Sequence, residues 1–268
     1  MQIRPGIELA NLSDVGCERS ENEDYFAYAE PESDEEYRTK GRLAIVADGM
    51  GGHEGGQIAS GIAVDFVRQT YFSFPSGDPE EALLEAFRSA QDAIHDWVGE
   101  HPELRGMGTT CTAAVLRGGE LHYAHVGDSR LYLLRNSTIT RLTRDHSWVN
   151  RLVEQGLITA EQAAVHPDRN VLTAALGMNS PPPADFSERP VALVAGDSIL
   201  LCSDGLHGLV SDQEMLAVVS GCDVASACRA LVEMAKQRGG FDNITVQILR
   251  MGERTSSSSD LARTVIEL

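Results

Sequence analysis

The segment LAIVADGMGGHEGG, residues 43–56, joins an apolar run to an aspartate and a glycine-rich turn. Short apolar and β-branched runs that stop at a turn are typical of buried strands. The end of a buried strand holds a carboxylate such as that of Asp48 rigidly, where it can point into a cleft. The glycines that follow allow close approach of the backbone beside it.

The same arrangement recurs at three other, distant places in the chain. The runs 121–126 and 198–203 lead into Asp128 and Asp204, and Asp242 closely precedes the run 244–249. Four carboxylates at strand ends can converge on one site at the end of a sheet. Because so many anions packed together are unfavourable unless cations neutralise them, the sequence predicts a metal site.

Composition limits the class of protein. The 268 residues contain no long linker, so one domain is expected, and 42% apolar and 6% aromatic residues are ordinary for a soluble protein. Five cysteines form no CxxC pair, no apolar stretch approaches the ~20 residues that cross a bilayer, and the first residues lack a signal-peptide core. The net charge of −18 argues against a nucleic-acid ligand. We expect a cytoplasmic protein with no nucleic-acid partner and no membrane association.

Hydrophobic periodicity and turn signals predict the helices and strands. The clearest helix follows the N-cap Asp78, and its apolar face comprises Leu83, Phe87, Ala90, Ile94 and Trp97. Further helices are expected over 57–71, 145–164 (with a break at Gly156), 212–219 and 224–237, a strand meander over 110–135, and a solvated charged loop over 30–40. The serine-rich tail, 251–268, is expected to be disordered. Together these elements predict an α+β fold in which helices cover two mainly antiparallel sheets.

The candidate metal ligands are all carboxylates, and oxygen ligands select Mg²⁺ or Mn²⁺ over zinc or copper. His122 and His125 offer no alternative, because their odd separation on one strand directs them to opposite faces. Two such ions can activate a shared water for attack on phosphorus. Arg19, in the segment that also supplies Glu23 and Asp24, is a candidate clamp for the substrate phosphate.

Seven segments of this chain resemble the metal-dependent serine/threonine protein phosphatases of the phosphatase 2C type, in their bacterial form. They cover roughly residues 9–250 in the family's order. The matching segments are SDVGCERSENED (13–24), VADGMGGHEGG (46–56), MGTTCTAAVL (107–116), HVGDSRLYLL (125–134), the stretch 142–177, LLCSDGLHGLVSD (200–212) and GGFDNITVQIL (239–249). Any one of these motifs alone would be weak, but seven in register are specific.

The resemblance implies a role for each candidate residue. Asp48 would bridge two Mn²⁺ or Mg²⁺ ions, and the carbonyl of Gly49 would bind one of them. Asp204 and Asp242 would complete the first ion, and Asp128, with Asp204, would bind a third, weaker ion. Glu23 and Asp24 would hold waters on the metals, and Arg19 would hold the phosphate. The implied fold is a four-layer α-β-β-α sandwich, with a catalytic domain over 1–250 and a helical flap at about 145–175.

The implied activity is hydrolysis of phosphoserine and phosphothreonine in proteins, by attack of a hydroxide that bridges the two ions. The implied partners are phosphorylated proteins, including a serine/threonine kinase or its targets, and a monomer is the default. Two alternatives stay open: a non-catalytic regulator that binds phosphoproteins, and a phosphatase of small phosphomonoesters. The four aspartates are all present, whereas non-catalytic relatives usually lose one or more.

Two positions need separate comment. Met50 stands where the eukaryotic form of the family has a histidine proposed as the general acid, so the identity of the acid stays open between His53 and a water on the metal. Cys111 and Arg117 have the spacing of cysteine-dependent phosphatases. The residues between them, TAAVL, form a strand pattern without the glycines of a phosphate-binding loop, so Cys111 is interpreted as a core residue.

Overall fold

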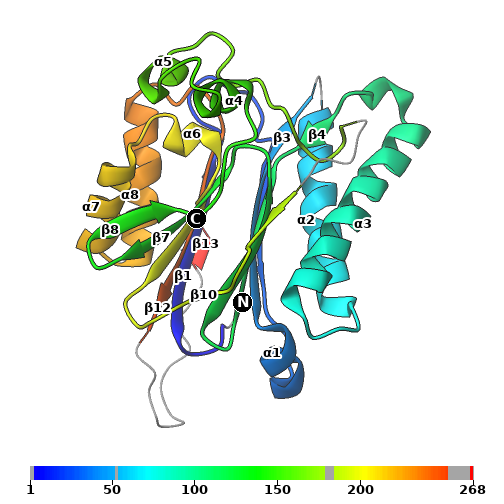
Figure 1. Ribbon diagram of the computed structural model, residues 1–268, viewed down its shortest axis with the longest axis vertical. Helices are drawn as coiled ribbons and strands as arrows, with labels where there is room; N and C mark the ends of the chain where they lie inside the picture. Colours follow the sequence, from blue (N-terminus) through cyan, green and yellow to red (C-terminus); the bar gives the residue numbers. More distant parts are fainter. Residues whose placement is uncertain (1–2, 52–53, 179–183, 253–265, 268) are drawn as a thin grey trace.

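The computed structural model has four layers, two helical and two of β-sheet, which lie side by side in Figure 1. It describes residues 3–51, 54–178, 184–252 and 266–267. The predicted α-β-β-α sandwich is therefore confirmed. Each sheet presents one face to the other sheet and its opposite face to a pair of helices.

The first sheet contains six strands among the described residues, and every neighbouring pair is antiparallel except β1 and β13. In spatial order they are β13 (Ile266–Glu267), β1 (Ile7–Asp14), β12 (Ile244–Met251), β11 (Ser198–Cys202), β7 (Arg130–Arg135) and β8 (Thr138–Arg141). The outer face of this sheet is covered by α7 (Asp212–Gly221) and α8 (Val224–Gln237).

The second sheet contains seven strands among the described residues, all paired antiparallel. Its main path is β10 (Val191–Ala192), β6 (Glu120–Val126), β5 (Cys111–Arg117), β3 (Arg42–Met50) and β2 (Asp24–Ala29), while β4 (Gly108–Thr109) pairs with β3 and β9 (Asp185–Phe186) with β6. The long helices α2 (Gly55–Ser73) and α3 (Pro79–Glu100) cover its outer face. The predicted N-cap at Asp78 is confirmed, because its side chain accepts a hydrogen bond from Glu80 N.

The remaining helices are short. They are α1 (Asp34–Lys40), η1 (Pro102–Leu104), α4 (Trp148–Glu154), α5 (Ala160–Ala164) and α6 (Asp204–His207). Figure 1 shows α1 at one end of the sandwich and α4 and α5 at the other. The predicted break at Gly156 falls between α4 and α5, where its φ is 70°. The capping box at Thr159 and Gln162 is also present.

Alternation along the central strands builds three apolar clusters. On β3, Leu43 and Ile45 face α2 and α3, whereas Ala44 and Val46 face the other sheet. On β11, Leu200 faces α7 and α8, and Leu201 faces the other sheet. Because both faces of these strands are buried, their sequences are continuous apolar runs.

The predicted strand meander over 110–135 is wrong in its last step. β5 and β6 form the expected hairpin across Gly118 and Gly119, but β7 pairs with β11 and β8 in the other sheet. The chain changes sheets at Gly127, where φ is 106° and a Cβ would lie 2.5 Å from the side chain of Thr110. Asp128 therefore stands where the chain passes from one sheet to the other.

The charged segment 30–40 is also not a simple loop. Helix α1 begins after the N-cap Ser33, whose side chain accepts from Glu36 N. Lys40 in its last turn is buried, and its Nζ donates to Ser76 O at 2.7 Å. The many charged residues of this segment suggested a loop, but the segment forms a helix whose last residue, Lys40, is held by the backbone carbonyl of Ser76.

Most of the tail, namely 253–265 and 268, lies outside the described residues, so its expected disorder stays a prediction. Within the described part of the chain, no helix is both long and apolar enough to span a bilayer.

Candidate active site

The four aspartates at strand ends lie close enough for their charges to interact. Helix α6, which begins at Asp204, lies below the flap helices α4 and α5 in Figure 1. Asp24 and Asp48 are directly opposite each other on the neighbouring strands β2 and β3. Asp204 is the first residue of α6, immediately after the buried strand β11. The predicted convergence is confirmed, because the charges of Asp24, Asp204, Asp128 and Asp242 all act on Asp48 and raise its pKa.

Crowding and burial give these carboxyl groups unusual pKa values. Burial first, and then the neighbouring carboxylates, raise the pKa of Asp48 and of Asp128 well above 3.8. Burial also raises the pKa of Asp24 to about 7 and that of Asp204 to about 6. Since a negative charge at each group penalises ionisation of the others, the cluster favours the binding of cations or protons.

Two carboxylate oxygens in this cluster are buried without any hydrogen-bond partner among the described residues: Asp24 Oδ1 and Asp204 Oδ1. Unsatisfied buried acceptors are rare and unfavourable, and divalent metals are suitable partners for them. No three His, Cys, Asp or Glu side chains in the described ranges form a preformed metal cage. The donor set nevertheless fits Mn²⁺ or Mg²⁺, because every candidate ligand is an oxygen.

Arg19 lies beside these aspartates, as predicted. Its Nη2 donates to Asp242 Oδ2 at 2.7 Å, and its Nη1 is 3.9 Å from Glu23 Oε2. The guanidinium side chain is 47% exposed, so it faces the solvent side of the carboxylate cluster. A cation in this position can hold a phosphate oxygen next to the aspartates.

The turn around Gly49 is built by close backbone contacts. Gly49 N donates to Glu23 O at 3.1 Å, and a Cβ on Gly49 would lie 2.1 Å from Gly56 O. The glycine-rich segment after Asp48 therefore serves close approach, as the sequence predicted. Burial raises the pKa of the Glu23 carboxyl, which Arg19 opposes.

Two residues that the sequence reasoning missed hold this region in place. Ser203 Oγ donates to Asp24 Oδ2 at 2.7 Å and accepts from Thr245 N at 3.0 Å. Asn243 Oδ1 accepts from Glu23 N at 2.8 Å, and its Nδ2 donates to two backbone carbonyls. Both stand next to a predicted aspartate in the sequence, and that adjacency was the only available signal.

Asp128 is positioned through its backbone. Its carbonyl accepts from His207 Nε2 at 2.9 Å, which connects the turn after β6 to α6. Gly127 N donates to His146 Nδ1 at 3.2 Å, which connects the same turn to the start of the flap. Burial lowers the pKa of His207 to about 3, so this imidazole is neutral and has one N–H to donate.

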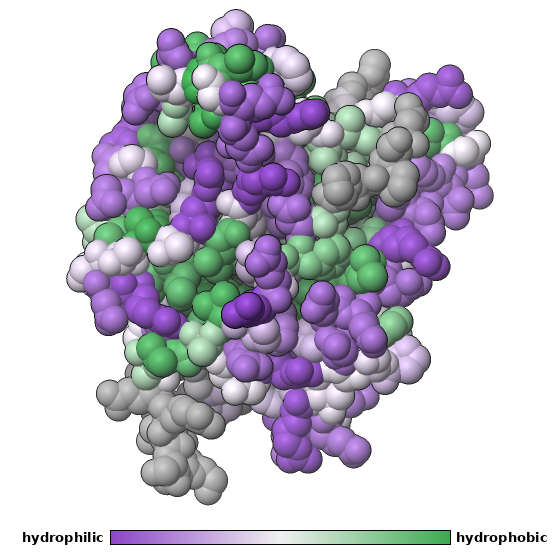
Figure 2. Space-filling model, in the orientation of Figure 1, coloured by the Kyte–Doolittle hydropathy of each residue, from purple (hydrophilic) through white to green (hydrophobic). Residues whose placement is uncertain are grey.

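The flap forms one wall of a cavity of about 370 Å³ beside the aspartates. Asp128 and Asp204 line it from below, and Asn150 and Ala163 line it from α4 and α5. Figure 2 shows hydrophobic side chains gathered on the surface of the flap region. Four exposed apolar residues belong to this segment: Trp148, Leu157, Val165 and Val171. The flap thus lies where it can contact a substrate.

Two other candidate residues, Cys111 and His53, have different outcomes. Cys111 is fully buried in β5, and burial raises the pKa of its thiol far above its usual range, so its interpretation as a core residue is confirmed. His53 lies outside the described residues, so the question of the general acid stays open.

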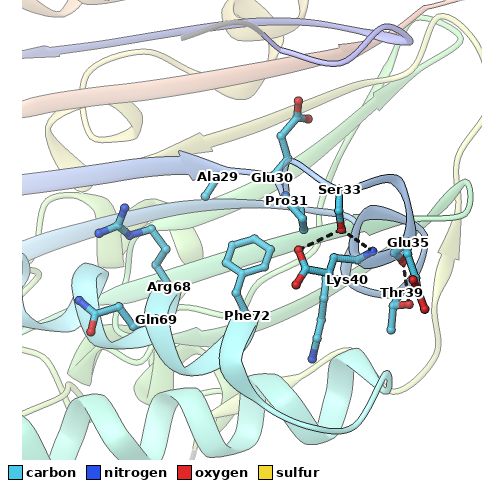
Figure 3. Close-up of a pocket in the computed structure, with 11 residues that line it drawn as sticks. Ala29, Glu30, Pro31, Ser33, Glu35, Thr39, Lys40, Arg68, Gln69 and Phe72 are labelled. Carbon is cyan, nitrogen blue, oxygen red and sulfur yellow. Dashed lines mark hydrogen bonds between the residues drawn. The ribbon is translucent and has the colours of Figure 1, made fainter.

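A second cavity, of about 840 Å³, lies at the opposite end of β2, between α1 and α2 (Figure 3). Phe72 and Arg68 project from α2 into it, next to Lys40. The cations here are already engaged, since Lys40 donates to Ser76 O at 2.7 Å and Arg68 pairs with Asp65 at 3.0 Å. This cavity is remote from the aspartates and offers no comparable chemistry.

The fold and the cluster define a class: α-β-β-α sandwich proteins with buried carboxylates gathered at the ends of strands from both sheets. The family model described as "Protein phosphatase 2C" matches residues 19–240. The chain belongs to the protein phosphatase 2C family.

Several similar proteins are bacterial. "Serine/threonine protein phosphatase PstP" of Mycobacterium tuberculosis is 39% identical over 243 residues, which are 90% of this chain but only 44% of PstP. "Protein phosphatase PhpP" of Streptococcus pneumoniae is 36% identical over 252 residues, 92% of this chain and 98% of PhpP. A crystal structure of the PstP catalytic domain in complex with two manganese ions has a TM-score of 0.79 at 36% identity, and the match covers 92% of this chain and 99% of that one.

Proposed function

We propose that this protein is a Mn²⁺- or Mg²⁺-dependent phosphatase that hydrolyses phosphoserine and phosphothreonine in proteins. The observation that carries the proposal is the cluster of Asp48, Asp204 and Asp242 beside Arg19, with an orphaned buried oxygen on Asp204. The names of PstP and PhpP support the same activity. The chain spans less than half the length of PstP. The proposed activity therefore rests on the residues of the site as well as on the similarity to PstP.

Each residue has a part in this proposal. Asp48, Asp204 and Asp242, with the carbonyl of Gly49, would hold two ions, and Asp128 would contribute to a third. Asp24 and Glu23 would accept hydrogen bonds from waters around them. When bound, the ions would lower the pKa of water and neutralise negative charge on the phosphoryl group. Arg19 would hold the phosphate through its guanidinium N–H groups and keep phosphorus in line for attack.

We further propose that residues 1–250 are the catalytic domain and that the flap controls access of the substrate. The proposed partners are phosphorylated proteins, including a serine/threonine kinase or its targets. A cytoplasmic monomer is the simplest form of this enzyme. Size-exclusion chromatography with light scattering would test the monomer directly.

The test of the function is hydrolysis of a phosphothreonine peptide by metal-stripped protein before and after addition of Mn²⁺. Asp204→Asn should abolish the metal-dependent activity. Asp92→Asn, an exposed aspartate on α3, is the matched control and should leave it unchanged. Folded wild-type protein that is inactive with every metal would favour the non-catalytic regulator. Faster turnover of a sugar phosphate than of the peptide would favour the small-molecule phosphatase.

A further inference from the structure

A groove of about 910 Å³ opens next to Arg19 and shares no lining residue with the flap cavity. Arg19 and Glu23 belong both to the site and to this groove. The other walls come from the start of α2, the last turns of α3 and η1. These walls contribute Glu54, Trp97, His101, Glu103 and Leu104, and Glu21 lines the groove from the segment of Arg19.

An aromatic platform forms part of this groove. The rings of Trp97 and His101 are stacked, with centroids 4.6 Å apart and an interplanar angle of 16°. His101 Nδ1 lies 3.1 Å from Trp97 O, and its backbone N–H donates to the same carbonyl. The sequence placed Trp97 on the buried face of α3, which is wrong, since 39% of this residue is exposed. A fixed, exposed indole is a good surface for an alkyl chain or a cation.

The charge of the groove is strongly negative. Glu21, Glu54 and Glu103 are exposed, and none has an ion-pair partner among the described residues. Glu23 adds a fourth carboxylate. Of the described lining residues, Arg19 is the only arginine or lysine, and it is already paired with Asp242 at 2.7 Å. Unpaired carboxylates around an aromatic surface complement a cation that has an apolar stem.

We propose that this groove binds the side chain of a lysine or arginine close in sequence to the phosphoresidue of the substrate. This inference rests on the proposed function, in which Arg19 holds the phosphate. Because Arg19 lines both sites and a peptide advances by about 3.3 Å per residue, the cation belongs within a few residues of the phosphothreonine. Its stem would pack on Trp97 and Leu104, and its charge would face Glu54 and Glu103.

The opposite charge is disfavoured by the same arrangement. A glutamate beside the phosphoresidue would meet carboxylates at short range, and like charges in contact are penalised. The net charge of −18 adds a long-range attraction for basic substrates. The groove would thus select basic phosphopeptides among all phosphoproteins.

The experiment compares kcat/KM, in Mn²⁺, for phosphothreonine peptides whose flanking positions on both sides carry arginine, alanine or glutamate. Wild-type enzyme should prefer the arginine peptide over the glutamate peptide by roughly tenfold, mainly through KM, and the preference should shrink at high salt. Glu103→Lys should reduce this ratio markedly, and Trp97→Ala should reduce the ratio of arginine to alanine. Because each ratio is measured on one enzyme preparation, a general loss of activity cancels.

Glu233→Lys on α8, the same charge change on the other face of the sandwich, is the control and should keep the wild-type ratio. Equal kcat/KM for the three peptides, a preference for glutamate, or a ratio that survives both groove variants would overturn the inference. In each of those cases Mn²⁺-dependent hydrolysis would still support the proposed function. Absence of hydrolysis of every peptide would instead overturn the proposed function and this inference with it.

Discussion

Removing the charge of Asp204 should stabilise the metal-free protein, although it would also remove one of the proposed metal ligands. Burial, and then the charge of Asp242, raise the pKa of Asp204 from 3.8 to about 6, so its ionisation opposes folding. A shift of about two pKa units corresponds to about 3 kcal/mol at pH 8, where the group is ionised in both folded and unfolded chains. Because Asp204 as a whole residue is only half-buried, solvent screening reduces the figure to about 2 kcal/mol.

Asn has nearly the same shape as Asp, and its amide N–H groups could donate to the neighbouring carboxyl of Asp48. In EDTA at pH 8, Asp204→Asn should therefore unfold at a temperature roughly 4–8 °C above that of the wild type. The sign of the pH dependence follows from the raised pKa. The loss of stability caused by ionisation of Asp204 is absent below the ordinary pKa of 3.8, grows as the pH rises to about 6, and is constant above that.

The advantage of Asp204→Asn should consequently be about half as large at pH 5 as at pH 8. Addition of Mn²⁺ should make the wild type more stable than the variant. Only the wild type gains the full free energy of metal binding, about 3 kcal/mol at a hundredfold excess over Kd. Thermal unfolding followed by circular dichroism measures both proteins in EDTA at pH 8, in EDTA at pH 5, and in Mn²⁺. A variant that is less stable than wild type in EDTA at pH 8, or a difference that does not depend on pH, would refute the reasoning.

Three further perturbations have definite expected outcomes. Cys111→Ser should keep its Mn²⁺-dependent activity, because the thiol is buried and protonated, and loss of activity in a folded variant would count against the metal mechanism. The rise in unfolding temperature on Mn²⁺ addition should be larger at pH 8 than at pH 6. Burial raises the pKa of Asp24 to about 7, so protons compete with the metal at the lower pH. A rise at pH 8 that is equal to or smaller than the rise at pH 6 would contradict this. Gly127→Ala should lower the free energy of unfolding in urea by roughly 2–3 kcal/mol, which is more than Gly196→Ala should. Both glycines have positive φ, but only a Cβ at Gly127 would meet a neighbour, at 2.5 Å from the side chain of Thr110. Equal urea midpoints for the two variants would contradict this.

The sequence was sufficient wherever the determining interactions are local. The apolar runs that end at Asp48 and Asp204 are buried strands, and the capping residues at Asp78 and Thr159 start helices as predicted. Carboxylates at strand ends converge because the sheets bring those ends to one edge. These features depend on residue order within one element and on the geometry common to all sheets.

The errors arise where distant segments compete. β7 follows β6 after a short turn, which favours a hairpin, yet β7 pairs with β11, a strand that the chain forms much later. The central position of β7 between β11 and β8 buries Leu131 and Tyr132 on both faces, which a hairpin at the sheet edge would not do. Burial over the whole molecule therefore outweighed the local turn signal.

Trp97 illustrates a limit of helical periodicity. The pattern correctly placed Leu83, Phe87 and Ile94 in the core. A helix of 22 residues is about 33 Å long, whereas a strand of seven residues such as β6 spans about 23 Å. The last turns of α3 therefore extend past the sheet, and the same face of the helix that packs on the core becomes a wall of the groove beside Arg19.

The contact between Arg19 and Asp242 could not be read from the sequence, although both residues were singled out there. At 2.7 Å the guanidinium neutralises one of the carboxylates that would otherwise repel the rest of the cluster. A divalent ion at Asp242 would take over that neutralisation and free the same N–H groups for a phosphate oxygen. In the proposed mechanism, binding of metal and binding of phosphate would then be linked through the side chain of Arg19. The proposed phosphate clamp would be fully available only when the aspartates hold their cations.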